Sequence, residues 1–73
     1  MIAPNKKPRK FAELRGKVYR AYTHQSDFAQ AMGMDPTAMS RRMTGCTDWS
    51  RGEIVRACQL LQIPLTEAHL YFF

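Results

Sequence analysis

The spacing of apolar residues predicts a helix where the apolar pattern of the chain begins. Phe11, Leu14, Val18 and Tyr22 recur every three or four residues, which places them on one face of a helix. Gly16 lies inside this pattern and costs about 1 kcal/mol relative to alanine. It therefore either admits a close neighbour or indicates that the helix begins later, near Leu14.

Two further helices are indicated by residues that favour helix ends. Ser26 is a preferred N-cap and predicts a short helix over residues 27–32, which Gly33 ends in the left-handed conformation. Asp35 is the next N-cap, and Pro36 suits the first position of the helix that follows. Only three residues separate the two helices. A turn of this length that contains glycine sets two helices at a large angle, the geometry of a helix-turn-helix.

The third predicted helix runs to about Met43 and is ended by Thr44 and Gly45. Met39 and Met43 face inward from it, one turn apart. The preceding helix contributes three more inward-facing residues: Phe28, Ala29 and Met32.

A fourth helix has the clearest start. Ser50 and Glu53 have the spacing of a capping box, and Trp49 and Ile54 are placed for a hydrophobic staple. Its apolar face consists of Ile54, Ala57, Cys58 and Leu61. No segment alternates apolar and polar residues with the period of a strand. The pattern therefore predicts one compact all-α domain of four or five short helices over residues 11–73.

The C-terminal segment is unusually apolar. Pro64 interrupts the chain, and Thr66 is expected to cap a last short turn over residues 67–71. The chain ends in four large apolar residues: Leu70, Tyr71, Phe72 and Phe73. Side chains of this size must pack against something, so we expect some to close the core and others to meet a partner, such as a second copy of the chain.

The charge of the chain is concentrated near its N-terminus. Of the 73 residues, 11 are Lys or Arg and 6 are Asp or Glu, a net charge of +5, and residues 1–20 alone carry +6. Residues 1–10 are rich in proline and lysine and indicate a flexible basic arm, with Lys6, Lys7, Arg9 and Lys10 as its cations. Such an arm favours a polyanion: nucleic acid first, and an anionic membrane surface second. The alternative is a solubilising tail without a partner.

Several function classes are excluded by size and composition. A chain of this length has no room for a large enzyme fold, and no apolar run approaches the roughly 20 residues of a membrane helix. No secretory signal precedes the domain, which favours the cytoplasm and reduced Cys46 and Cys58 thiols. The chain has no metal-ligand spacing and no glycine loop that would cradle a phosphate, so we expect no metal, no cofactor and no catalysis.

The outer face of the third helix carries side chains that suit DNA recognition. Arg41 can form two hydrogen bonds to the O6 and N7 atoms of guanine in a major groove. Thr37 and Ser40 can bond base edges or phosphates. Arg42 has two open interpretations, a phosphate contact or an ordinary surface arginine.

Residues 25–33 and 35–45 resemble the helix-turn-helix of the phage Cro/repressor (XRE-like) family. They read QSDFAQAMG and DPTAMSRRMTG, which align with the family motif over 21 consecutive residues without a gap. The flanking segments 14–18, 47–49 and 63–73 are similar to small Cro-like regulators of phages of Gram-positive bacteria. The resemblance implies a lambda-repressor-like bundle of about five helices that binds operators as a dimer and regulates transcription, usually as a repressor.

The resemblance also implies roles for single residues. Gln25 matches a glutamine that often contacts a phosphate. Three residues match positions that most often touch bases, with Ser40 beside them: Pro36, Thr37 and Arg41. Pro36 replaces a common polar reader and has no N–H to donate. Arg42 occupies a position that is frequently apolar in the family.

Two functions follow from the sequence. The first is a sequence-specific regulator that binds double-stranded DNA in the host cell, with residues 36–43 in the major groove. The second is a protein-interaction module, such as an anti-repressor or adaptor, that keeps the helix-turn-helix fold and uses the apolar C-terminus. The basic arm, Arg41 and Arg42 favour the first function, because an adaptor needs none of them.

Overall fold

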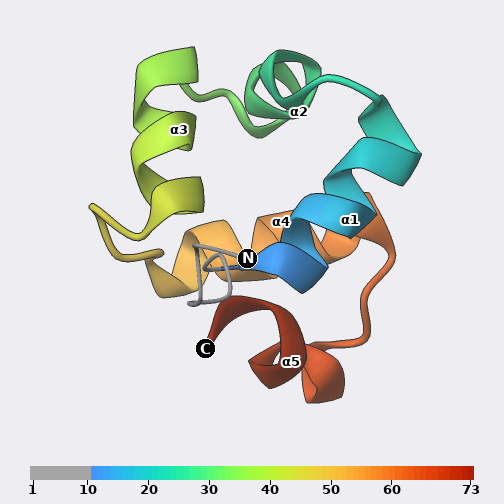
Figure 1. Cartoon of the computed structure of the whole chain (residues 1–73). Coiled ribbons are helices and arrows are strands. Elements are labelled where there is room, and N and C mark those ends of the chain that lie inside the picture. The colour runs from blue at the N-terminus through green and yellow to red at the C-terminus, as the bar shows by residue number, and fades with distance from the viewer. Residues whose placement is uncertain (1–10) are drawn as a thin grey trace, which may run out of the picture.

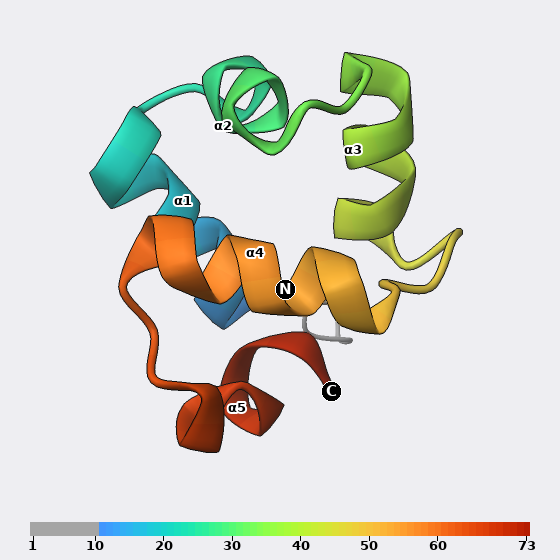
Figure 2. The same ribbon diagram turned by 180° about the vertical axis from the view of Figure 1, so that it is seen from behind.

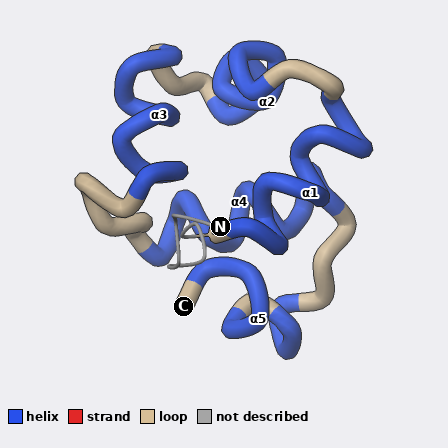
Figure 3. Tube along the Cα trace, in the orientation of Figure 1, coloured by secondary structure: helices blue, strands red, loops and turns tan. Residues whose placement is uncertain are grey.

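A computed structural model describes residues 11–73 (Figures 1 and 3). Over this range all regular secondary structure is helical and no strand is present, which confirms the all-α prediction. The elements are α1 (Ala12–Tyr22), α2 (Gln25–Met32), α3 (Pro36–Thr44), α4 (Arg51–Leu61), a 3-10 turn η1 (Leu65–Glu67) and α5 (His69–Phe72). Within these residues no helix is long and apolar enough to cross a membrane. The predicted arm, residues 1–10 with its four cations, lies outside the described residues.

The helices pack around α1 and α4, which lie together in the middle of the molecule (Figures 1 and 2). On one side, α2 contacts both of these helices; on the other, α5 packs against α1. The recognition-helix candidate α3 packs mainly against α2. Figure 1 shows α2 nearly end-on while α3 runs along the plane of the view, so the two helices cross at a large angle.

The core consists of the predicted inward faces. Met39 and Met43 of α3 are fully buried, as are Phe28 and Leu14. Tyr22 packs against Phe28 with ring centroids 5.4 Å apart. The remaining residues of the core have fractional exposures of at most 8%: Val18, Ala29, Met32, Ala57, Cys58, Leu61, Ile63, Ala68 and Phe72. The inward positions predicted for the second and third helices are thus confirmed.

The ends of α3 and α4 form as predicted. Asp35 caps α3 by accepting a hydrogen bond from the Thr37 N–H at 2.9 Å, and Gly45 ends it with φ +87°. Ser50 and Glu53 form the complete capping box of α4. Gly33 ends α2 with φ +73°, a conformation that glycine adopts without steric cost.

Two predicted N-caps are wrong. The second helix begins at Gln25, so Ser26 lies inside it, because only Thr23 and His24 separate α1 from α2 and the first turn closes on the carbonyl of His24. Thr66 lies inside the 3-10 turn and caps nothing, because the carbonyl of Pro64 already accepts the N–H of Glu67 at 2.8 Å. In both places the length of the connection decides where the helix starts, rather than local cap preference.

The C-terminal apolar residues divide as expected between core and surface. Phe72 is buried and meets the edge of Trp49 with ring centroids 5.1 Å apart. Tyr71 is half-buried, whereas Leu70 and Phe73 are 57% and 86% exposed. Trp49 and Ile54, the predicted staple, line one hollow beside Phe72.

Neither explanation offered for Gly16 holds. It lies inside α1, which begins four residues earlier, and a Cβ added to it would meet no other atom within 4 Å. Glycine at this position therefore only adds conformational freedom to the unfolded chain.

We predict that Gly16→Ala stabilises the protein by about 0.5–1 kcal/mol, because the folded conformation accepts alanine and the unfolded chain loses entropy. The measurement is the free energy of unfolding in urea. Gly33→Ala is the matched control: its left-handed backbone should make the same substitution destabilising by about 1–2 kcal/mol. Equal effects of the two substitutions would contradict this account.

Candidate nucleic-acid interface

The outer face of α3 is one continuous exposed surface. Its residues line an open hollow of about 560 Å³: Pro36, Thr37, Ser40, Arg41, Thr44 and Cys46. Most follow the spacing of one helix face, since Pro36, Ser40 and Thr44 are each four residues apart. The predicted base-reading residues are therefore brought together as the sequence indicated, with Arg41 exposed among small side chains.

The far end of this face is shaped by the loop after α3. The N–H groups of Cys46 and Thr47 both bond the carbonyl of Arg41, at 2.9 and 3.2 Å, so the chain turns back toward the helix. The hydroxyl of Thr44 donates within the helix to the carbonyl of Ser40 at 3.0 Å. Cys46 was not predicted on this face, because its placement depends on the loop and not on helix periodicity.

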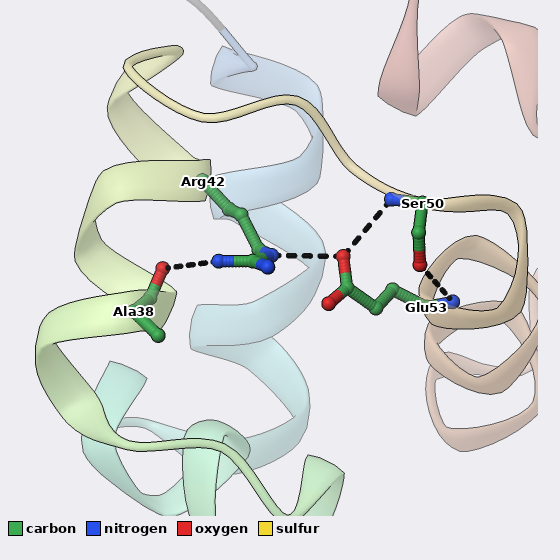
Figure 4. A network of polar contacts seen from close by, with 4 residues as sticks. All are labelled: Ala38, Arg42, Ser50 and Glu53. Carbon is green, nitrogen blue, oxygen red and sulfur yellow. Dashed lines mark hydrogen bonds and ion pairs between the residues drawn. The ribbon is translucent and has the colours of Figure 1, made fainter.

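Arg42 does not share the exposed face. Its Nε donates to Oε1 of Glu53 at 2.8 Å, and its Nη1 donates to the carbonyl of Ala38 at 3.2 Å (Figure 4). The Arg42 and Glu53 side chains are only 19% and 23% exposed. The structure thus separates Arg42 from the other predicted DNA contacts and gives it a different task, which is to join α3 to the start of α4.

Glu53 is the meeting point of this network. Its Oε1 also accepts the Ser50 N–H at 2.9 Å, while its own N–H donates to the Ser50 hydroxyl at 3.2 Å (Figure 4). The hydrogen bond from Arg42 is the main cause of a lowered pKa of the Glu53 carboxyl, and the Ser50 N–H adds to it; partial burial opposes both. The carboxylate is therefore favoured in the folded protein.

Gln25, the predicted phosphate contact, is the first residue of α2 and is partly buried. It lines a second hollow, of about 250 Å³, together with Arg15, Tyr19 and Thr23. Arg15 also donates to the carbonyl of Met43 at 3.2 Å, which ties α1 to the C-terminal end of α3. The cations predicted for the arm precede residue 11 and lie outside the described residues.

The described residues contain few other groups that could bind a metal ion or react. Within residues 11–73 no three His, Cys, Asp or Glu side chains lie close enough to hold a metal ion. The two cysteines are free: Cys46 is exposed, and burial raises the pKa of the Cys58 thiol, which keeps it protonated in the core.

Comparison with protein families gives a match over most of the chain. Residues 9–73 match the model of a family described as "Protein of unknown function (DUF739)", which covers most of the chain. No curated protein matches.

We predict that the Arg42–Glu53 pair stabilises the protein in a pH-dependent way. Because the folded pKa of Glu53 is lowered, its stabilisation is present above the unfolded pKa of about 4.5 and is lost as the pH falls through the folded value. Glu53→Gln should lower the free energy of unfolding by about 1 kcal/mol at pH 7.

The measurement is urea unfolding of wild type and Glu53→Gln between pH 3 and 7. The difference between them should shrink below pH 4.5. Glu67→Gln, which changes an exposed acid, serves as the control and should differ little from wild type at any pH. A difference between wild type and Glu53→Gln that stays constant with pH would contradict the assignment.

Proposed function

The chain belongs to the DUF739 family, and we propose that it is a transcriptional regulator that binds double-stranded DNA sequence-specifically. In this proposal α2 and α3 are the helix-turn-helix, and α3 lies in the major groove, which accommodates one α-helix. By occupying an operator the protein would exclude polymerase and repress a promoter.

One observation carries the proposal: the exposed face of α3 presents Arg41 among small polar side chains. Thr37 and Ser40 are short enough to let the helix approach base edges closely, and Arg41 is long enough to reach the O6 and N7 atoms of a guanine. The inner face of the helix is anchored in the core by the fully buried Met39 and Met43. Direct readout requires a few polar side chains that are presented to base edges.

Phosphate contacts would position α3. Gln25 at the start of α2 is one candidate, and the cations Lys6, Lys7, Arg9 and Lys10 of the N-terminal segment are others. The net charge of +5 supports binding to a polyanion. Arg42 is left out of this set, because its guanidinium already bonds Glu53 and a backbone carbonyl of its own helix.

A homodimer is part of the proposal. Phe73 and Leu65 are exposed and line an apolar hollow of about 530 Å³ beside Trp49, Ile54 and Val55. Leu70, on the same C-terminal segment, is also exposed. A second copy that covers these side chains would pair two recognition helices on the two halves of an inverted repeat.

The same exposed C-terminus favours a second candidate function. A protein-interaction module, such as an anti-repressor or adaptor, would use Phe73 and its neighbours to bind another protein and would not need Arg41. The two candidates differ in their dependence on salt, because phosphate contacts release counterions and apolar contacts do not.

The test of the proposal is selection from random DNA duplexes at near-physiological salt, followed by sequencing of the bound fraction. Enrichment of an inverted repeat is the expected result for a dimeric reader, and a single motif would indicate a monomer. Binding without enrichment would make the protein a non-specific DNA binder. No binding at all would favour the protein-interaction module.

We predict that Arg41→Ala weakens binding to the selected sequence by about 1–3 kcal/mol and relaxes the preference at one base pair, because a bidentate contact to guanine is lost. Lys6→Ala and Lys7→Ala provide the contrast: they should weaken binding to all sequences alike and reduce the salt dependence. The measurement is the Kd for matched and mismatched duplexes over a range of salt concentrations. If Arg41→Ala binds every duplex as wild type does, α3 is not the reading element.

A further inference from the structure

We propose that Arg42 is a positioning residue for DNA reading: through Glu53 it fixes the orientation of α3, and with it the place of Arg41, without touching DNA. The inference rests on the proposed function. It assigns opposite tasks to two arginines that are neighbours in the sequence, one facing the groove and the other facing the protein.

Helix α3 is supported mainly from one side. Its principal packing partner is α2, to which a three-residue turn connects it. That turn and the Asp35 cap hold the N-terminal end. Toward the C-terminal end, besides the buried side chain of Met43, two polar links reach other helices: Arg15 of α1 to the carbonyl of Met43, and Arg42 to Glu53 of α4.

The link that Arg42 forms between α3 and α4 is rigid. The guanidinium is planar and bonds at two points, to the carbonyl of Ala38 in its own helix and to Oε1 of Glu53 (Figure 4). Glu53 in turn is held by the Ser50 N–H at the first turn of α4. An unbroken chain of hydrogen bonds therefore runs from the backbone of α3 to the backbone of α4.

A small rotation of α3 is enough to displace a reading side chain. Side chains reach about 5–6 Å from a helix axis, so a rotation of α3 by about 20° would move the outer atoms of a reading side chain by about 2 Å. Hydrogen-bond lengths vary by only about 0.5 Å. A small loss of orientation is therefore enough to remove a bidentate contact by Arg41 while the phosphate contacts, which tolerate more freedom, persist.

The negative charge of Glu53 allows a positioning role to be distinguished from a purely electrostatic effect on DNA binding. A carboxylate in a DNA-binding protein repels phosphates, so its removal should on electrostatic grounds tighten binding to every sequence. If Glu53 positions α3 through Arg42, its removal should instead lower the preference for the selected sequence over unrelated DNA.

The experiment compares Arg42→Met and Glu53→Met with two matched controls. Arg56→Met removes the same charge from an exposed arginine of α4, which bonds the carbonyl of Ala31. Ser50→Ala removes the hydroxyl of the capping box and keeps both hydrogen bonds accepted by Glu53 Oε1. For each variant, Kd is measured for the selected duplex and for an unrelated duplex of equal length, over a range of salt, below the unfolding temperature.

The expected result is that Arg42→Met and Glu53→Met each reduce the ratio of specific to non-specific affinity about tenfold, and that the double variant is no worse than either. The two controls should leave this ratio within about twofold of wild type. The salt dependence of Arg42→Met should equal that of Arg56→Met. Amide hydrogen exchange at residues 41–45, measured without DNA, should accelerate in Arg42→Met and not in Arg56→Met.

Three results would overturn the inference. One is an unchanged ratio in Arg42→Met when wild type discriminates between the duplexes. Another is a salt dependence in Arg42→Met that is lower than in Arg56→Met by about one phosphate contact, which would make Arg42 a DNA contact. The third is unchanged hydrogen exchange at residues 41–45. Failure of the proposed function is a separate outcome, in which wild type itself binds both duplexes equally and the exchange measurement alone decides whether Arg42 holds α3.

Discussion

The arrangement of the candidate interface depends on a single carboxylate oxygen. Oε1 of Glu53 accepts hydrogen bonds from the Ser50 N–H at 2.9 Å and from Arg42 Nε at 2.8 Å. The first bond starts α4, and the second attaches α3 to it. In a chain of 73 residues the core is small, so apolar burial alone leaves little to orient a helix that packs mainly on one neighbour. A hydrogen-bonded link at the edge of the core fixes the orientation of α3, because hydrogen bonds are directional and apolar contacts are not.

Much of the fold could be predicted from the sequence because its helices carry strong local signals. The capping box at Ser50, the Asp35 cap and the left-handed glycines Gly33 and Gly45 each act within one turn of chain, and all four form as predicted. The N-cap predicted at Ser26 failed for the opposite reason. A good capping residue cannot set a helix start when the preceding connection is only two residues long, and that length depends on how α1 and α2 pack.

The difference between local signals and tertiary packing also explains which parts of the interface could be predicted. Helix periodicity was sufficient to place Thr37, Ser40 and Arg41 on the exposed side of α3, since the positions of Met39 and Met43 fix the opposite side. Arg42 lies on the boundary between these faces, where periodicity does not decide the direction of a long side chain. Its partner Glu53 is eleven residues away across a loop, so only the tertiary structure brings the two side chains together.

At the boundary position of Arg42, an arginine has a physical advantage over an apolar residue. An apolar side chain there would extend the core but would bind α4 without a preferred orientation. Arginine covers the same surface with its aliphatic stem and adds a planar group whose bonds have fixed directions. The cost of desolvating the pair is limited because both side chains keep about a fifth of their surface in water. An ion pair at the core edge can thus fix the angle of a helix at a small desolvation cost. The preceding residue, Arg41, meanwhile points outward.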